Sequence, residues 1–200
     1  MGLLTGALSF TRYNVVGQEP DPFWQVIDEK IRAFAFREIE GGTEEVSRGW
    51  VALHNMLDSE FSYASYACGD YLTFSFRVDR KNIPGALLKK RVMEEEQRLK
   101  NETNRKRVSR QELSELRERA RISLMSRTLA VPSLFDVLWS VSQKWLIFSG
   151  VSAKLRTEFE EYFKQCFELE LIPYRPWDIA SAPQSAVKNL MNVEPQQFLD

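Results

Sequence analysis

The sequence predicts an α+β fold, in which two strand–helix lobes with antiparallel sheets flank a protruding, charged helical hairpin. Short runs rich in β-branched and aromatic residues, separated by turn residues, occur in both halves of the chain and predict strands. Between them lie two consecutive amphipathic segments with a short polar connection, which is typical of an antiparallel pair of helices. The same central region, residues 77–127, contains 16 Lys and Arg but only 8 Asp and Glu, whereas the whole chain contains 27 and 28. The protein is therefore nearly neutral overall and strongly basic at its centre.

These features divide the 200 residues into four regions. They are an N-terminal lobe over residues 1–83, the helical hairpin over 84–130, a second lobe over 131–176, and a C-terminal tail or short helix over 177–200. A chain of this length is long enough to bury a substantial core. Its 44% hydrophobic and 12% aromatic content favours a globular protein over a disordered one.

In the first lobe, residues 8–16 predict a strand, and Pro22 precedes a helix with a single apolar stripe. Residues 47–54 predict a second, short strand. Residues 63–66 and 71–78 predict the arms of a hairpin around a Cys-Gly-Asp turn, because apolar residues alternate along the second arm with period two. The stripe of the predicted helix consists of Phe23, Val26, Ile27, Ile31 and Phe34.

The helical hairpin begins after Asn82, which we expect to be the N-cap, with Pro84 in the first helical turn. The first helix is expected to end near Thr103. Ser109 and Glu112 have the spacing of a capping box, which predicts the start of the second helix. The apolar stripe of the second helix is Leu113, Leu116, Ala120 and Leu124. Because such stripes are narrow, much of the hairpin is expected to stand in solvent.

In the second lobe, residues 135–141 and 145–151 predict another β-hairpin, and Ser152 is expected to cap a helix. Residues 169–174 predict a closing strand. Further along the chain the pattern weakens, and residues 184–191 form either a short helix or part of an irregular tail. The helix after Ser152 is expected to face inward through Leu155, Phe159, Phe163 and either Cys166 or Phe167.

No group of residues in this sequence is typical of an enzyme. His54 is the single histidine, so no catalytic triad or multi-histidine metal site is expected within one copy, and the nine glycines never form a phosphate-binding loop. Asp28-Glu29-Lys30 is the one segment that resembles part of a metal-dependent nuclease site, but these residues continue the solvent face of a predicted helix. We therefore expect no enzymatic activity, no metal site and no cofactor.

The cysteines and the hydropathy pattern bear on the compartment. Cys68 and Cys166 are far apart, with no metal-like spacing around either residue, which favours reduced and buried thiols in a cytoplasmic protein. No run approaches 18 consecutive apolar residues, so no membrane-spanning segment is expected.

Acidic neighbours divide the basic residues of the centre into two groups. Arg98, Lys100, Lys106 and Arg119 each follow a glutamate by four positions, which favours ion pairs along a helix. Several others have few or no acidic neighbours, and this imbalance is typical of a face that binds phosphates. The candidate phosphate-contacting residues are Arg77, Arg80, Lys81, Lys89, Lys90, Arg91, Arg105, Lys106, Arg107 and Arg110.

The charge pattern alone leaves three partners open, namely nucleic acid, an acidic protein and an anionic membrane surface. The membrane has the least support, because the apolar stripes contain Leu and Ala but no Trp or Phe near the basic face. The spacings of helix-turn-helix and zinc-finger proteins are absent, so reading of the base sequence is not indicated. Contact with phosphates without sequence recognition is the favoured interpretation.

Several landmarks, taken in order along the chain, resemble the recombination-associated protein RdgC family of bacteria over about residues 8–176. Ser126 stands where the family favours proline, and the chain stops near the point where the last third of longer members begins. The matching segments are Ser9-Phe10-Thr11-Arg12-Tyr13, Ala33-Phe34-Ala35-Phe36, Gly49-Trp50-Val51, the run from Arg77 to Lys90, Leu124-Met125-Ser126-Arg127, Leu138-Trp139 and Val151-Ser152-Ala153-Lys154.

The resemblance implies a nucleoid-associated cytoplasmic protein that binds DNA, preferably duplex, without sequence preference. It also implies a homodimer that forms a ring around DNA, restrains RecA and modulates recombination linked to replication. A ring contact supplied by the family's last third would be missing here. The resemblance implies no established catalytic role, although some descriptions of the family name an exonuclease. The alternatives to DNA binding are a non-enzymatic scaffold that docks a protein on its charged arm, and a metal-dependent exonuclease.

Overall fold

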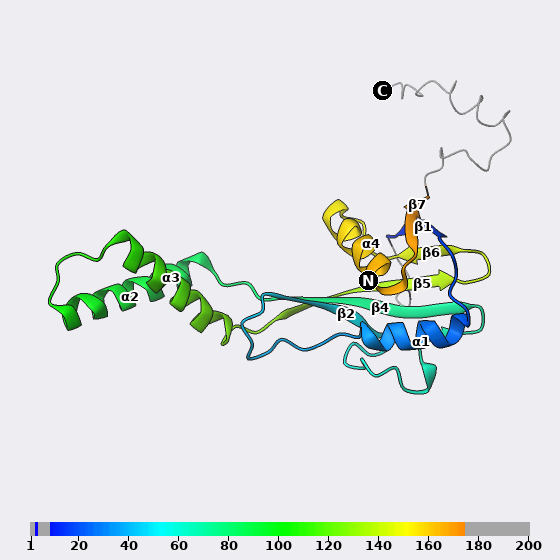
Figure 1. Ribbon diagram of the computed structural model, residues 1–200, viewed down its shortest axis with the longest axis horizontal. Coiled ribbons are helices and arrows are strands. Elements are labelled where there is room, and N and C mark those ends of the chain that lie inside the picture. Colours follow the sequence, from blue (N-terminus) through cyan, green and yellow to red (C-terminus); the bar gives the residue numbers. More distant parts are fainter. Residues whose placement is uncertain (1–2, 4–8, 175–200) are drawn as a thin grey trace, which may run out of the picture.

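One antiparallel sheet organises the protein, and a pair of helices extends from one end of it (Figure 1). The computed structural model describes Leu3 and residues 9–174. Within this part of the chain, seven strands follow the order β2-β4-β5-β6-β1-β7, with β3 paired to β4, and four α-helices accompany them. The predicted α+β class is confirmed. The tail or short helix predicted over 177–200 lies outside the described residues.

The strands that we assigned to two lobes belong to this single sheet. β1 comes first in the chain but pairs with β6 and β7, and β4 pairs with β5 along its whole length, from Tyr71↔Ser140 to Arg80↔Val131. Periodicity predicts a strand but not its partner, which is why the sequence did not join the lobes. The strands are β1 (Thr11–Val16), β2 (Val46–Ala52), β3 (Ala67–Cys68), β4 (Tyr71–Arg80), β5 (Val131–Ser140), β6 (Trp145–Phe148) and β7 (Glu170–Pro173).

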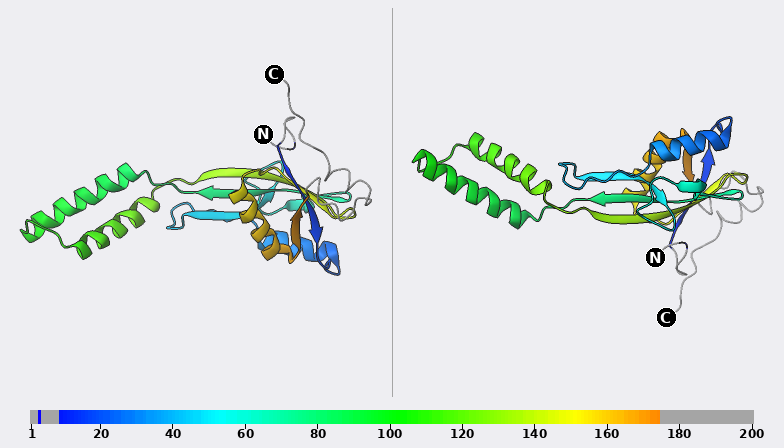
Figure 2. Two further views of the ribbon diagram at one scale, coloured as in Figure 1. Left: turned by 90° about the horizontal axis from the view of Figure 1, so that it is seen from above. Right: turned by 90° about the horizontal axis from the view of Figure 1, so that it is seen from below.

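The four helices fall into two pairs with different surroundings. α1 (Phe23–Ala33) and α4 (Ala153–Phe167) lie on the same face of the sheet, as Figure 2 shows. α2 (Gly85–Thr103) and α3 (Arg110–Met125) form an antiparallel hairpin that projects beyond the sheet. We call this hairpin, residues 85–125 with its connecting loop, the arm, and we call the sheet with α1 and α4 the body.

The core of the body is built from aromatic side chains between the sheet and its two helices. The alternation predicted along β4 is confirmed, because Leu72, Phe74 and Phe76 are fully buried on the helix-covered face. The rings of Phe148 and Phe159 stack with their centroids 3.8 Å apart and an interplanar angle of 4°. Aromatic contacts of this kind add to the stabilisation from burial alone. The other large, fully buried side chains include Trp50, Trp139, Tyr13, Phe61, Phe163, Ile27 and Ile31.

Most of the local predictions agree with the structure, and two do not. Ser109 and Ser152 both cap helices through their side chains, as expected. Asn82 is not a cap, because α2 begins at Gly85 after Pro84, without a side-chain cap. The predicted strand over 63–66 is wrong. Residues 62–64 form a short 3-10 turn instead, and the chain turns here so that Phe61 and Tyr66 can both enter the core.

Candidate nucleic-acid interface

The arm is held together by a thin apolar seam and by pairs of charges. α2 has no fully buried residue, and α3 has only Ala120 and Met125. Leu88 and Val92 from α2 and Leu113 from α3 line a groove between the helices. A helix pair with so little buried surface depends on local interactions for much of its stability. The arm is therefore a predominantly polar structure, as its sequence predicts.

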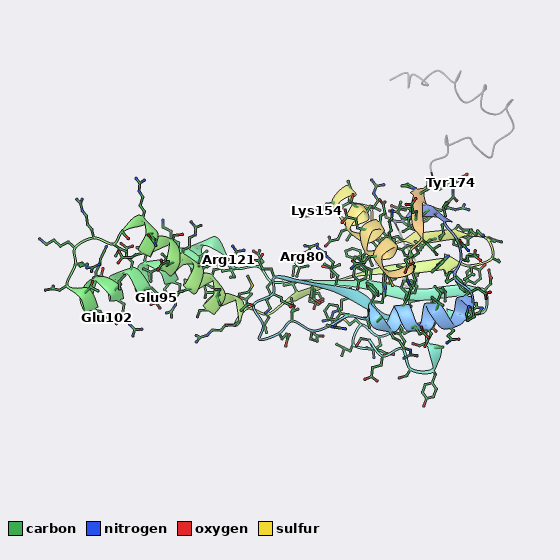
Figure 3. The ribbon with its side chains drawn as sticks, viewed as in Figure 1. Arg80, Glu95, Glu102, Arg121, Lys154 and Tyr174 are labelled. Atoms are coloured by element: carbon green, nitrogen blue, oxygen red, sulfur yellow. The ribbon has the colours of Figure 1, made fainter. Side chains whose placement is uncertain are left out.

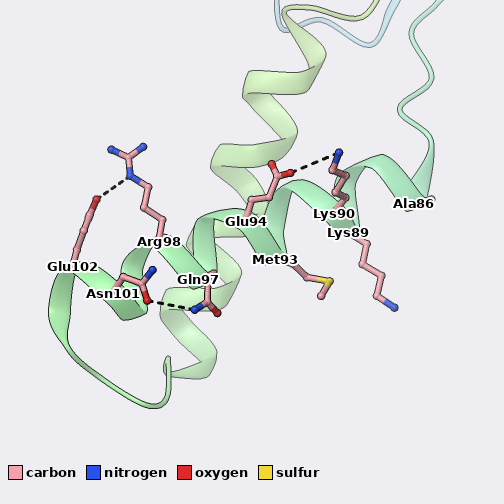
Figure 4. A pocket seen from close by; sticks show the side chains of 9 residues that line it. All are labelled: Ala86, Lys89, Lys90, Met93, Glu94, Gln97, Arg98, Asn101 and Glu102. Atoms are coloured by element: carbon pink, nitrogen blue, oxygen red, sulfur yellow. Dashed lines mark hydrogen bonds and ion pairs between the residues drawn. The ribbon is translucent and has the colours of Figure 1, made fainter.

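Most cations on α2 have an acidic partner within the helix. Arg91 pairs with Glu95 at 2.9 Å, and Lys100 pairs with Glu96 at 2.6 Å as predicted. Arg98 pairs with Glu102 at 2.9 Å rather than with the glutamate four positions before it. Figure 4 shows this pair and the looser contact of Lys90 with Glu94, at 3.8 Å, on the outer face of α2. Along this helix the positive charge is largely neutralised.

The loop that joins the two helices carries cations without acidic partners. α2 ends where Asn104 adopts a left-handed conformation, with φ of 52°. We call the exposed segment from Asn104 to Arg110 the basic tip. Because the helix has already ended, Lys106 cannot form the helical ion pair that we predicted for it. Within the described residues, Lys106, Arg107 and Arg110 make no ion pair. All three are exposed.

The two carboxylates nearest to the basic tip are committed elsewhere. Glu102 binds Arg98. Glu112 closes the capping box, accepting a hydrogen bond from the Ser109 backbone N–H at 2.8 Å, and it also pairs with Arg105 at 3.2 Å. The hydrogen bonds with Ser109, with a smaller contribution from Arg105, hold the pKa of Glu112 below its usual range. The carboxylate therefore stays charged and occupied, which leaves the remaining tip cations free to attract an anion.

Arg77 is wrongly assigned to a phosphate-binding surface by the sequence. Arg77 is 5% exposed, and its guanidinium makes two parallel hydrogen bonds to Asp79, at 2.8 and 2.7 Å. It also pairs with Glu38 at 3.0 Å and lies over the ring of Phe36, 4.0 Å from its centroid. The sequence contained a signal for the Arg77–Asp79 pair, because residues two apart in a strand lie on the same face.

The other two candidates at the base of the arm are also engaged within the protein. Arg80 pairs with Glu158 at 2.6 Å, and Glu158 also binds Arg48. Lys81 is 6% exposed and donates to two backbone carbonyl oxygens. Lys81 is therefore inaccessible to a phosphate, whereas Arg80 keeps 43% of its side chain exposed.

The three candidates at the start of α2 differ from one another. Lys89 is exposed and makes no ion pair within the described residues. Arg91 contacts both Glu94 and Glu95, so little of its charge is free.

Lys154, which the sequence did not suggest, lines a shallow pocket together with Arg80 and Ser152. Figure 3 shows Arg80 and Lys154 on the same side of the molecule. Lys154 was missed because it is distant from the basic region in the sequence.

The residues considered for metal-dependent chemistry each interact with other side chains of the protein. Asp28 accepts hydrogen bonds from Arg32 and from the Tyr66 hydroxyl, at 2.9 and 2.6 Å. Lys30, beside it in the sequence, pairs with Glu168. Among residues 3 and 9–174, no three His, Cys, Asp or Glu side chains are grouped so that they could hold a metal ion.

The two thiols lie in contrasting environments. Cys68 is exposed and Cys166 is buried, so the prediction of buried thiols holds for only one of them. Burial raises the pKa of Cys166 to about 12, although the Trp50 indole N–H donates to its sulfur at 3.2 Å. Neither cysteine lies in the arm. No helix in the described part of the chain is long and apolar enough to cross a membrane.

The fold and the basic tip define a class of protein: an α+β body that presents a helical arm with unpaired cations at its end, suited to binding a polyanion. The sequence model of one protein family, described as "RdgC: Putative exonuclease, RdgC", matches residues 17–196. The chain belongs to the RdgC family, and the resemblance found in its sequence is confirmed. Membership supports a role related to recombination. The comparison with curated proteins gave no match.

Proposed function

We propose that this protein binds DNA through the basic tip of its arm, without sequence preference, and that binding modulates RecA-dependent recombination. The observation that carries the proposal is the contrast within the arm. Cations along α2 are paired with glutamates, whereas Lys106, Arg107 and Arg110 are exposed and make no ion pair in the described structure. Unpaired cations gain most from neutralising phosphates, because binding releases the counterions condensed on DNA.

The composition of the arm favours contact with the duplex backbone over contact with bases. Residues 85–125 contain no Phe, Tyr, Trp or His. Proteins that bind single strands usually stack bases on aromatic side chains, and the arm offers none. Cations on a loop reach phosphates, which position a protein on DNA but carry no sequence information. A preference for duplex and indifference to sequence therefore belong to the same proposal.

The proposed biological consequence follows from occupancy. A protein that covers phosphates along duplex DNA competes with other proteins for that surface, and the competitor that we propose is RecA. We include in the proposal a homodimer, location at the nucleoid and binding without catalysis. A measurement of solution mass tests the dimer, and RecA-dependent strand exchange in the presence of increasing protein tests the antagonism.

The decisive experiment is a salt titration of binding to a duplex of random sequence, measured by fluorescence anisotropy. If the tip neutralises about three phosphates, log affinity should fall against log salt with a slope of about −3. The triple variant Lys106→Ala/Arg107→Ala/Arg110→Ala should lose most of this slope, and equally so on duplexes of unrelated sequence.

A matched control removes the same number of charges from the paired cations of the same arm. In the variant Arg91→Ala/Arg98→Ala/Lys100→Ala, each lost cation has a glutamate partner in the structure. Its slope should stay close to that of the wild type. An affinity that is indifferent to salt, or equal losses in both triple variants, would reject the basic tip as the DNA-binding surface.

A second candidate function is an interaction scaffold, and one observation favours it. The outer face of α2 exposes Met93 by 60% and has a shallow pocket lined by Ala86, Met93 and Gln97 among others (Figure 4). Exposed apolar side chains with a charged rim are common at protein-binding sites. Charge reversal at Lys89, Arg105 and Arg107 separates the two functions. Under the scaffold proposal DNA affinity stays unchanged while an acidic protein partner is lost.

The exonuclease alternative makes a separate prediction. Incubation of labelled duplex with the protein and magnesium should shorten the DNA, and Asp28→Asn should abolish the shortening. We propose instead that the DNA remains intact in both samples, which denaturing electrophoresis measures directly.

A further inference from the structure

The base of the arm contains a buried lysine whose role differs from that of the tip cations. The arm joins the body through the ends of β4 and β5, and a small group of polar contacts lies at this junction. Lys81, the residue after β4, is at its centre. We call the group formed by Lys81, Gly42, Glu45, Arg121 and Met125 the arm clamp.

Lys81 connects two distant parts of the chain with a single side chain. Its ammonium group donates to the Gly42 carbonyl oxygen at 2.9 Å and to the Met125 carbonyl oxygen at 3.2 Å. Gly42 belongs to the loop before β2, and Met125 is the last residue of α3. The carbonyl groups at a helix C-terminus have no partner within the helix and carry partial negative charge. Lys81 therefore ties the end of the arm to the body.

The part of the body that receives Lys81 is itself fixed. Ile39 is 4% exposed and anchors the loop in the protein. The Gly42 N–H donates to the Ile39 carbonyl oxygen at 3.1 Å, which closes a turn. Gly41 has φ of +74°, a conformation that residues other than glycine rarely adopt. The Gly42 carbonyl is thus held in position by contacts that do not involve Lys81.

A second, exposed contact runs beside the first. The Lys81 backbone N–H donates to the Glu45 carbonyl oxygen at 2.9 Å, and the Glu45 carboxylate pairs with Arg121 on α3. Both side chains of this ion pair are about half exposed, so salt should weaken it. Lys81 is shielded from solvent, and its two hydrogen bonds should respond little to salt.

We infer that Lys81 is a positioning residue that fixes the direction in which the arm projects from the body. Burying an ammonium group without a carboxylate partner is costly, and an apolar side chain would fill the same space at lower cost. The charge is useful at this position because it binds two carbonyl groups on different elements, the loop before β2 and the end of α3. The consequence for DNA affinity rests on the function proposed above, whereas the consequence for the arm's direction does not.

The direct test measures the distance from body to arm by pulsed electron paramagnetic resonance. Cys68 is exposed and provides the body label, Asn101→Cys on α2 provides the arm label, and buried Cys166 should remain unlabelled. The wild type should give one narrow distance distribution. Lys81→Met, which keeps the aliphatic stem but removes the charge, should broaden or split it. Lys89→Met, an exposed lysine on the same arm, should leave it unchanged.

DNA binding gives a second readout that a merely structural residue would not produce. Lys81→Met should weaken duplex binding severalfold at fixed salt while leaving the slope of log affinity against log salt unchanged. A lysine that contacted a phosphate would reduce that slope by about 0.9. If no DNA binding is found at all, the proposed function fails, but the distance measurement still decides the role of Lys81.

Three outcomes would overturn the inference. The first is a narrow and unshifted distance distribution in folded Lys81→Met. The second is a slope of log affinity against log salt that is reduced by about 0.9 in that variant. The third uses the labelled wild type and applies even if Lys81→Met does not fold. At about 1 M salt, where exposed ion pairs are screened, the distribution should stay narrow, and broadening would show that Arg121 and Glu45 hold the arm instead.

Discussion

The body and the arm of this protein are stabilised in different ways. In the body, aromatic rings such as Phe148 and Phe159 are completely buried between a sheet and two helices. In the arm, only Ala120 and Met125 are buried, and many of the side-chain contacts are ion pairs at the surface. The stability of the body should therefore depend little on salt, whereas that of the arm should depend on it.

The energies involved explain why unpaired cations can be concentrated on the arm. Exposed ion pairs along a helix contribute only about 0.2–0.5 kcal/mol each, so leaving some arm cations unpaired costs little stability. A comparable unpaired charge inside the body would cost several kcal/mol. A protein that must present free cations can do so safely on a solvated arm anchored to a stable body.

The largest expected effect comes from the centre of the aromatic core. Phe159→Ala removes the ring that stacks on Phe148 and should lower the free energy of unfolding by about 3–5 kcal/mol, measured by denaturant titration. Met93→Ala on the arm, where the side chain is 60% exposed, should change it by less than about 0.5 kcal/mol. Similar losses in both variants would remove the distinction between the two regions.

A somewhat smaller effect is expected from the buried ion pair of β4. Arg77→Met leaves the Asp79 carboxylate, 1% exposed, without its partner and should cost about 3 kcal/mol. The double variant Arg77→Met/Asp79→Leu should recover most of this loss, because neither charge then remains buried alone. Folded Arg77→Met should bind DNA with the salt slope of the wild type. A reduced slope would return Arg77 to the binding surface.

A change at the capping box should affect the arm alone. Ser109→Ala removes the hydroxyl that accepts from the Glu112 N–H at 3.1 Å and should destabilise the start of α3 by about 1 kcal/mol. Hydrogen exchange should accelerate in the first turn of α3 and stay unchanged in β4 and β5. Ser114→Ala, in the exposed middle of the same helix, is the control and should not accelerate exchange. Faster exchange throughout the sheet would mean that arm and body unfold together.

The smallest effect is a pH dependence of the same helix start. The folded pKa of Glu112 is lowered, first by the hydrogen bonds with Ser109. Its contribution is therefore complete above the pKa of a free glutamate and is lost as the pH falls through the lower folded value. Exchange in the first turn of α3 should accelerate over this acidic range, and Glu112→Gln should abolish that pH dependence. Unchanged acceleration in Glu112→Gln would assign it to another group.

Local signals in the sequence predicted the helices well. The capping box of Ser109 and Glu112, the cap at Ser152 and the stripe containing Ile27 and Ile31 each depend on residues within a few positions of one another. Such features are readable because a helix repeats every 3.6 residues and its ends need side-chain partners. The basic tip was also recognised, since its excess of charge is local.

Most errors among the candidate site residues and in the sheet concern partners that are distant in the sequence, whereas the Asn82 cap and the strand over 63–66 were errors in local features. In the sequence Lys81 has no visible partner, because Gly42 and Met125, whose carbonyl oxygens it binds, are distant along the chain. The same holds for Arg80 and its partner Glu158. The single sheet was not predicted for the same reason, because β1 pairs with β6 and β7, which lie near the end of the described chain. Arg77 is the exception, since its partner is only two residues away and the rule for strands would have found it.

The last feature to consider is the register of β4 and β5, in which Arg80 faces Val131. These two residues are neighbours across the ladder, so the whole arm occupies the place where an ordinary β-hairpin would have a short turn. In this topology the arm takes the place of a hairpin turn, and exposed ends of this kind are where insertions are tolerated best. A change in the length or charge of the arm should therefore leave unaltered the strand pairing on which the body depends.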